Sequence, residues 1–215
     1  MWKSVWRVFP FSLLFSLSPL SQQVLGDTKL KDLQRYIVVT AYCCDAIGDT
    51  RGVQRAFYQT PAGWRPSLFT NLPKGKGRVD PDGDLLARDA AMRTTAAPTY
   101  FPIYQGYCDG SVFANNPSLS AIARAMSSMP DYVTAETCVC LSLGTGATNT
   151  YITGKFHDWG LAQWARWLVQ LLFDSTNSSI DMNMHLLLGE RFMRINDALP
   201  REIELDDTSW LEESG

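Results

Sequence analysis

The chain has no excess of basic residues: 19 Lys and Arg stand against 22 Asp and Glu, a formal net charge of −3. A nucleic-acid-binding domain needs a basic face to neutralise phosphates, so no nucleic-acid partner is expected. The one local basic run, residues 74–78, is typical of a solvated loop. Hydrophobic residues make up 46% of the 215 positions. That share is enough for a core, and one domain is expected at this length.

The cysteines lack the spacing of a zinc site or of a disulfide framework. Their number is odd, and no C-x₂-C pair occurs. We therefore predict no metal and no cofactor. Because most of the cysteines stand in apolar, strand-like runs, we predict buried free thiols in a reducing compartment. The five are Cys43, Cys44, Cys108, Cys138 and Cys140.

The N-terminal segment also lacks a long apolar run. Lys3 and Arg7 precede an apolar stretch, which is the outline of a signal peptide. However, Pro10 and Pro19 interrupt that stretch, and no A-x-A-like cleavage site follows it. The stretch is too short for a transmembrane helix. We expect residues 1–25 to remain attached as a helical lead-in of a cytoplasmic protein. The alternative is a secreted protein in which they act as a signal peptide.

Strand and helix patterns alternate along the rest of the chain. Apolar, β-branched runs predict buried strands, and a helix is expected wherever a cap or an early proline precedes an apolar face. This order predicts an α/β domain with a mostly parallel central sheet. The expected strands are 36–43, 56–60 and 137–143; the expected helices are 85–95 with Asp84 as N-cap, one beginning near Pro117, and 158–173 as the longest.

An acidic turn offers the clearest candidate for chemistry. The segment from Tyr107 to Pro117 predicts a short strand, a tight turn that carries Asp109, and the start of a helix. Asp-Gly is the commonest turn dipeptide, so the dipeptide alone would indicate only a turn. An acid at the end of a sheet strand is, however, where many α/β enzymes hold a catalytic carboxylate.

The sequence around Asp109 resembles the patatin-like phospholipases. That family has an alanine-rich helix ending in a Pro-x-Tyr-Phe step, an Asp-Gly-Gly or Asp-Gly-Ala motif followed by Asn-Asn-Pro, and a Leu-Ser-Leu-Gly-Thr-Gly strand end. The set of motifs is specific, although each alone is weak. The resemblance is clear over residues 30–150. The matching blocks are 71–73, 88–102, 109–117 and 141–146.

The resemblance implies a fold, an activity and a site. The fold is a three-layer αβα domain, and the activity is hydrolysis of lipid acyl esters, at a lipid or membrane surface, by a Ser-Asp dyad. Asp109 would be the general base, in a motif completed by Gly110 and Ser111. Ser111 stands where the family has glycine or alanine, so its hydroxyl is expected to compete for the carboxylate.

The chain departs from the family at the nucleophile. No G-x-S-x-G elbow occurs in the 215 residues; residues 48–52 have threonine at the centre and predict a hairpin turn. Residues 1–215 are therefore interpreted as one partial patatin-like domain whose N-terminal strands are missing, and self-association through an unpaired sheet edge is expected. The alternative is a catalytically inactive lipid-binding or regulatory remnant.

Three further features are weighed against simpler interpretations. The segment Gly144–Gly146 is interpreted as a strand-end turn, because it lacks the lysine and the glycine spacing of a phosphate loop. His157 and His185 lie far from every motif and are interpreted as surface or packing residues. The apolar, Trp-rich segment 158–173 predicts a core helix, with contact to lipid or to an acyl groove as the alternative.

Overall fold

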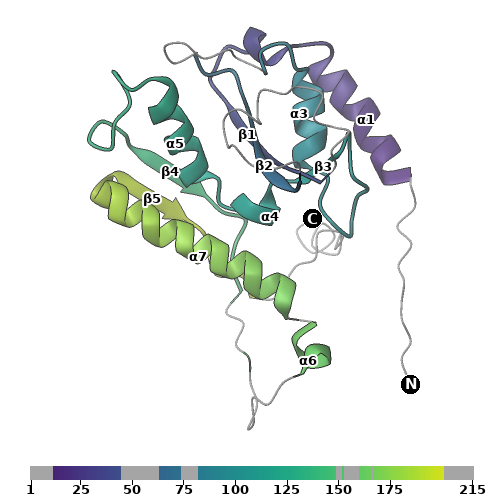
Figure 1. Cartoon of the computed structure of the whole chain (residues 1–215), viewed down its shortest axis with the longest axis vertical. Coiled ribbons are helices and arrows are strands. Elements are labelled where there is room, and N and C mark those ends of the chain that lie inside the picture. The colour runs from purple at the N-terminus through teal and green to yellow at the C-terminus, as the bar shows by residue number, and fades with distance from the viewer. Residues whose placement is uncertain are drawn as a thin grey trace.

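The computed structural model describes residues 12–44, 63–73, 82–148, 152, 160–165 and 167–200. Within them the chain forms helices and two open sheets, with the three-stranded sheet in the upper part of Figure 1 and the two-stranded sheet beside α5 and α7. The expected α/β class is confirmed.

The larger sheet has the order β2–β1–β3, with both pairings antiparallel. Its strands are β1 (Val38–Cys43), β2 (Arg65–Thr70) and β3 (Tyr107–Asp109). β1 is central because its run of β-branched and aromatic residues fits a pleated surface with neighbours on both sides. Asp109 at the end of β3 pairs with Ala41 of β1.

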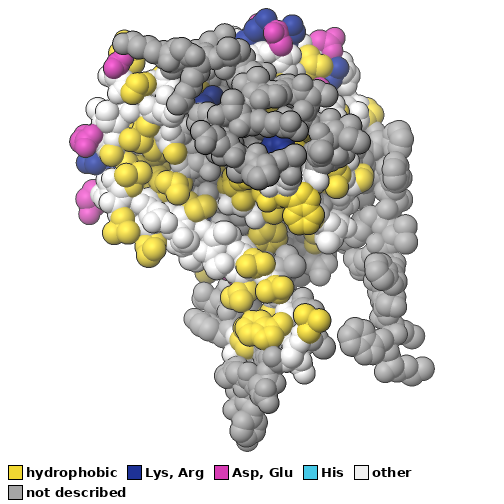
Figure 2. Space-filling model, in the orientation of Figure 1, with side chains coloured by type: hydrophobic (Ala, Val, Ile, Leu, Met, Phe, Trp, Pro, Cys, Tyr) yellow, Lys and Arg dark blue, Asp and Glu magenta, His cyan; other side chains and the backbone are white. Residues whose placement is uncertain are grey.

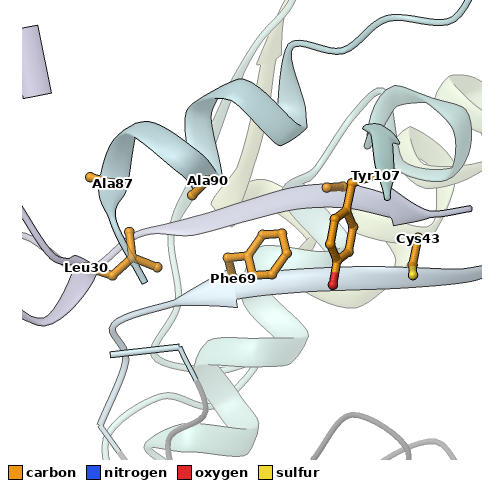
Figure 3. Packing of buried hydrophobic residues seen from close by; sticks show 7 residues of the cluster. Leu30, Cys43, Phe69, Ala87, Ala90 and Tyr107 are labelled. Atoms are coloured by element: carbon orange, nitrogen blue, oxygen red, sulfur yellow. The ribbon is translucent and has the colours of Figure 1, made fainter. Parts of the chain in front are cut away.

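One helix covers one face of this sheet and meets it through small side chains. Helix α3 (Ala87–Thr94) packs against β1 and β3, and α1 (Ser12–Leu25) packs against α3. Ala87 and Ala90 bring α3 close to the rings of Phe69 and Tyr107, as Figure 3 shows. Leu30, in the 3₁₀ turn η1 (Leu30–Asp32), completes this first core.

The second sheet pairs β4 (Cys140–Leu143) with β5 (Phe192–Ile195) in parallel. One of its faces packs against two helices. The second core there consists of Ile122, Met184, Leu188 and Phe192. The helices of this part are α4 (Ser111–Ala114), α5 (Ser118–Ser128), α6 (Leu161–Ala165), α7 (Leu168–Leu188) and the 3₁₀ turn η2 (Gly189–Arg191).

Strand direction differs between the two sheets. Parallel pairing, which was expected to dominate, is found between β4 and β5, whereas the β2–β1–β3 sheet is antiparallel. The expected strand at 56–60 lies outside the described residues. The strand expected at 137–143 is shorter and more exposed than predicted: Leu143 is 71% exposed, because its side of β4 faces away from α5 and α7.

Two expected helix boundaries are corrected. Asp84 does not cap α3, which begins at Ala87 with Leu86 as N-cap; its carboxylate instead accepts hydrogen bonds from Lys29 and Lys31. The longest helix is α7, which begins at Leu168 and ends at Leu188. It therefore covers only the end of the expected helix 158–173, and α6 lies in the part before it. The C-terminal half of α7 supplies Met184 and Leu188 to the second core.

The N-terminal segment is helical, as expected, over Ser12–Leu25, and Leu25 packs against the first core. Pro19 lies inside this helix, although proline in a helix interior removes a backbone hydrogen bond. Within the described part of the chain, no helix has the length and apolar content needed to cross a bilayer.

The five cysteines are free thiols, as predicted. The expectation of burial holds for two of them, Cys43 and Cys108. Cys44, Cys138 and Cys140 are partly exposed; Cys44 lies just past the end of β1, Cys138 lies two residues before β4, and Cys140 is the first residue of β4.

Candidate functional site

Asp109 is held at the junction of a strand, a helix C-terminus and a turn. Its backbone N–H donates to the Ala96 carbonyl oxygen at 2.9 Å, just after the end of α3. Its carboxylate Oδ1 accepts from the backbone N–H of Ser111 at 2.7 Å. The side chain is half-buried. The hydrogen bond to Ala96 thus joins the acidic turn to the alanine-rich block, two of the sequence motifs on which the family resemblance rests.

Position 110, directly after this aspartate, must be glycine because β1 approaches it closely. A Cβ atom at position 110 would lie 2.5 Å from the carbonyl carbon of Thr40 and closer still to its hydroxyl oxygen, which is nearer than real Cβ atoms come to other heavy atoms. Gly110 is buried and has an ordinary right-handed backbone conformation. Its role is therefore to let α4 start against β1, which fixes the direction of the Asp109 turn.

Burial makes the Asp109 carboxyl a better proton acceptor. Desolvation raises the pKa of Asp109 above its ordinary value of 3.8, while hydrogen bonds from the backbone and the hydroxyl of Ser111 act in the opposite direction. Burial disfavours the charged form of a carboxyl group, and a raised pKa moves it toward the range useful for a general base. The Ser111 hydroxyl was expected to compete for the Asp109 carboxylate, and it does form a hydrogen bond with it.

The Asn-Asn-Pro motif reaches the later Leu-Ser-Leu motif and not the carboxylate. Asn116 is fully buried; its Oδ1 accepts from the Ser118 backbone N–H at 3.2 Å and from the Ser118 hydroxyl. The same oxygen is 3.3 Å from the Ser142 hydroxyl, which in turn accepts from Arg194 Nη1 at 2.7 Å. Asn116 thus accepts a hydrogen bond from the first residue of α5 and ties this helix to β4 and β5.

The sequence analysis placed Asn116 only in the Asn-Asn-Pro motif and missed its link to Ser142. The alternation of side chains along β4 is the signal that could have placed Ser142 on the inner face. Asn115, which was grouped with Asn116, is exposed. Ala96 stands in the matching block 88–102, whereas nothing in the sequence indicated that Thr40 approaches Gly110.

The segment Gly144–Gly146 is a strand-end turn, as predicted. The Gly144 N–H donates to the Ile195 carbonyl at 2.8 Å, and the Gly146 N–H donates to Asn196 Oδ1 at 2.9 Å. A Cβ atom at Gly144 would overlap the Asn196 amide, and Gly146 has a φ of 106°.

The remaining predicted features make other contacts or lie outside the described residues. Asn71, from the Asn-Leu-Pro block, accepts from the Ile37 N–H at 2.8 Å and so braces the start of β1. His185 lies on the exposed side of α7 and packs edge-on against Phe192, with ring centroids 4.9 Å apart. His157 and residues 48–52 and 74–78 lie outside the described residues.

Where the structure describes the Trp-rich segment, several of its apolar side chains are more exposed than a core helix would leave them. Leu161 of α6 is 86% exposed and Leu172 of α7 is 56% exposed. Hydrophobic side chains gather over α6 and the start of α7 in the lower part of Figure 2. Across the described part of the chain, no group of three or more His, Cys, Asp and Glu is placed to hold a metal ion.

Comparison with known proteins identifies relatives along most of the chain. It is 31% identical to the cGAMP-activated phospholipase of Escherichia coli (strain TW11681), over 90% of this chain and 53% of the relative. Patatin-like protein 4 of Arabidopsis thaliana is 24% identical over 88% of this chain and 51% of the relative. Patatin-like protein 1 of the same plant is 26% identical over 78% and 40%. No model of a protein family matches the chain.

The chain spans about half the length of the curated relatives that it matches.

Proposed function

Because this chain belongs to the patatin-like family, we propose that it carries the general base of a lipid acyl hydrolase. In the proposed reaction, Asp109 takes the proton of a serine hydroxyl as that oxygen attacks the carbonyl carbon of a lipid ester. A serine hydroxyl is a weak nucleophile until a base accepts its proton. The substrate class proposed is a phospholipid or another acyl ester at a lipid surface, and the role is lipid degradation.

The position of Asp109 carries this proposal. The carboxyl group is half-buried with a raised pKa, and its turn is fixed by the Ala96 carbonyl and by the close approach of Thr40 to Gly110. A perturbed carboxyl on a fixed turn is a candidate for acid–base chemistry, because active sites are places where burial is arranged to shift pKa values. The family motif around Asp109 agrees with this role.

The nucleophile of the proposed dyad is not among the 215 residues, since they contain no G-x-S-x-G. We propose that hydrolysis requires an elbow serine supplied by a further segment, and that these residues alone lack turnover. Removal of a nucleophile leaves a deficit of about a thousandfold or more even where substrate still binds. Sequencing the transcript upstream of the Met1 codon will show whether a reading frame with the elbow precedes it.

The test uses phospholipid vesicles and a nitrophenyl ester as substrates. The 215-residue chain should give only background hydrolysis and should not react with a serine-directed fluorophosphonate. A form that includes an elbow should be active, and Asp109→Asn should abolish that activity while folding is retained, because the amide cannot accept the proton. Asn115→Ala is the matched control and should keep activity. Full activity of Asp109→Asn would overturn the assignment of the base.

A second candidate, a non-catalytic lipid-binding remnant, is favoured by the exposed apolar side chains of α6 and α7. Exposed aromatic and aliphatic side chains on a helix are suited to an interfacial position on a bilayer. A vesicle sedimentation assay distinguishes the two candidate functions. Under this second candidate, the 215 residues bind phosphatidylcholine vesicles, Leu161→Lys with Leu172→Lys abolishes binding, and an elbow-containing form stays inactive.

We also propose self-association through the outer face and edge of the β4–β5 sheet. Leu141 and Leu143 on β4 and Met193 on β5 are all more than half exposed, and in the described part of the chain β4 pairs only with β5. Exposed apolar strands with an open edge invite pairing with another copy. Sedimentation velocity should show association that Leu143→Lys reduces; a monodisperse monomer would contradict the proposal.

A cytoplasmic location is proposed from the five free thiols. The N-terminal sequence of the protein from its native host tests it: a mature start near residue 22 to 27 would mean cleavage and export.

A further inference from the structure

Two cysteines from different strands meet beside the acidic turn. Cys44 Sγ lies 3.3 Å from Cys108 Sγ, although the residues are 64 positions apart in the chain. Cys44 follows the last residue of β1, and Cys108 is the middle residue of β3. The Cys44 N–H donates to the Gly106 carbonyl oxygen at 2.9 Å, which holds this end of the two strands together.

Strand register explains why these two thiols meet. Tyr42 pairs with Cys108, and Cys44 continues the strand to a position opposite Gly106, so the two cysteines are diagonal neighbours on the same face of the sheet. Cys43 points to the opposite face, where it is fully buried in the first core beside Tyr107 (Figure 3). Adjacent cysteines in the sequence therefore have different neighbours.

The two thiols differ in how readily they react. Cys44 is partly exposed, whereas Cys108 is only 7% exposed. Burial, with the hydrogen bond shared with Cys44 as a second cause, raises the pKa of Cys108 to about 12. A thiolate is the attacking species in thiol–disulfide exchange, so the accessible thiol reacts first and the buried one follows.

We propose that Cys44 and Cys108 form a reversible disulfide that links the end of β1 to β3. With a low-molecular-weight disulfide as oxidant, the Cys44 thiolate attacks one sulfur of the oxidant and releases one thiol. The sulfur of Cys108 loses its proton, attacks the Cys44 sulfur and releases the second thiol. Two protein thiols are oxidised, and one external disulfide is reduced to two thiols.

The geometry requires only a local adjustment. The sulfurs must approach from 3.3 Å to about 2.05 Å. The bond fixes the strand end next to Asp109. The effect of this bond on Asp109 matters for catalysis only if the proposed function is correct, whereas formation of the disulfide does not rest on that function. A negative result for one proposal therefore leaves the other standing.

The experiment treats the reduced, folded 215-residue chain with oxidised glutathione and then counts thiols by alkylation and intact mass. The expected result is a fall from five alkylatable thiols to three, with no glutathione attached to the protein, and a peptide pair joining residues 44 and 108 in a non-reducing digest. Dithiothreitol should restore all five. Five remaining thiols, or a link through another pair, would overturn the proposal.

Variants identify the order of the two steps. Cys108→Ser should trap the mixed disulfide of glutathione on Cys44, whereas Cys44→Ser should leave Cys108 reduced in the folded protein. Cys43→Ser and Cys140→Ser are matched controls and should form the same link as the original chain. Cys138 and Cys140 are the main competitor, since they are separated by one residue and both are partly exposed.

A denatured control shows whether the fold selects the pair. In concentrated urea the disulfide between residues 44 and 108 should no longer form in preference to disulfides between other cysteines, because the strand register that brings these sulfurs together is lost. An unchanged preference in urea would show that the sequence spacing, and not the structure, selects the pair. The peptide map of the original chain needs no variant, so a substitution that fails to fold does not affect this test.

Discussion

The β2–β1–β3 sheet and the β4–β5 sheet differ in how their apolar side chains are covered. No large hydrophobic residue of β1, β2 or β3 is exposed, and the core between these strands and α3 includes the fully buried Phe69. In the second sheet one face packs on α5 and α7 through Phe192, while Leu143 and Met193 on the other face are 71% and 63% exposed.

This contrast separates the candidate site from the candidate interfaces. Asp109 belongs to the covered sheet, where strand pairing and the close approach at Gly110 fix the direction of its turn. The half-covered sheet and the exposed start of α7 present apolar surface instead. Catalytic groups need rigid placement, and apolar surface suits partners or lipid, so the two regions are suited to different tasks.

The largest expected difference between the regions comes from side-chain truncation. Phe69→Ala removes a fully buried ring that contacts Tyr107 edge-on, with centroids 5.4 Å apart, and lies 4.9 Å from the Arg93 guanidinium. We expect a loss of about 3–5 kcal/mol in the free energy of unfolding. Leu143→Ala, at an exposed position, should change it by about 0.5 kcal/mol or less. Urea unfolding measures both, and equal losses would remove the contrast between the sheets.

The next largest effect is expected at the glycine that joins the site to β1. Gly110→Ala places a Cβ atom against the backbone of Thr40, which cannot move as a side chain can. We expect destabilisation of about 1–3 kcal/mol or more. Gly160→Ala is the control, since its Cβ would meet only the end of the flexible Gln163 side chain, at 3.4 Å. A Gly110→Ala protein as stable as the original would show that β1 does not constrain this turn.

Asn116→Ala tests the polar link between α5 and the second sheet. The substitution removes the cap of Ser118 and leaves the buried Ser142 hydroxyl without that contact. A lost buried hydrogen bond costs about 1–3 kcal/mol. Asn115→Ala, on the exposed neighbour, should cost about 0.5 kcal/mol or less, although the motif alone suggested similar roles for both. Thermal unfolding of the two variants compares them, and similar losses would refute the distinction.

The smallest effect is expected from the Asp109 charge. Because the folded-state pKa is raised above 3.8, the folded state binds more protons than the unfolded state between the two pKa values. Stability therefore falls as pH rises through that window, and the loss persists above the folded pKa. Asp109→Asn removes this slope while its amide oxygen still accepts from Ser111. Urea unfolding between pH 3 and pH 8 should show that the free energy of unfolding of the variant, relative to that of the original chain, increases as pH rises. The opposite trend would mean that the folded-state pKa of Asp109 is lowered.

Local structure and family membership could be predicted from the amino-acid sequence. The Val38–Cys43 run specified a strand, the segment before Gly26 specified a helix, and the motif set around Asp109 specified the family. These features depend on composition, local pattern and short spacings, which the chain carries without reference to distant residues. The acidic turn at Asp109 could therefore be singled out from the sequence alone.

Contacts between distant residues depended on the tertiary structure. Strand direction, the contact of Thr40 with Gly110, the link between Asn116 and Ser142, and the meeting of Cys44 with Cys108 all require pairing between segments far apart in the chain. The exposure of β4 was likewise settled by which of its faces the helices cover. An apolar run shows that a strand is favourable, but its burial depends on what packs against it.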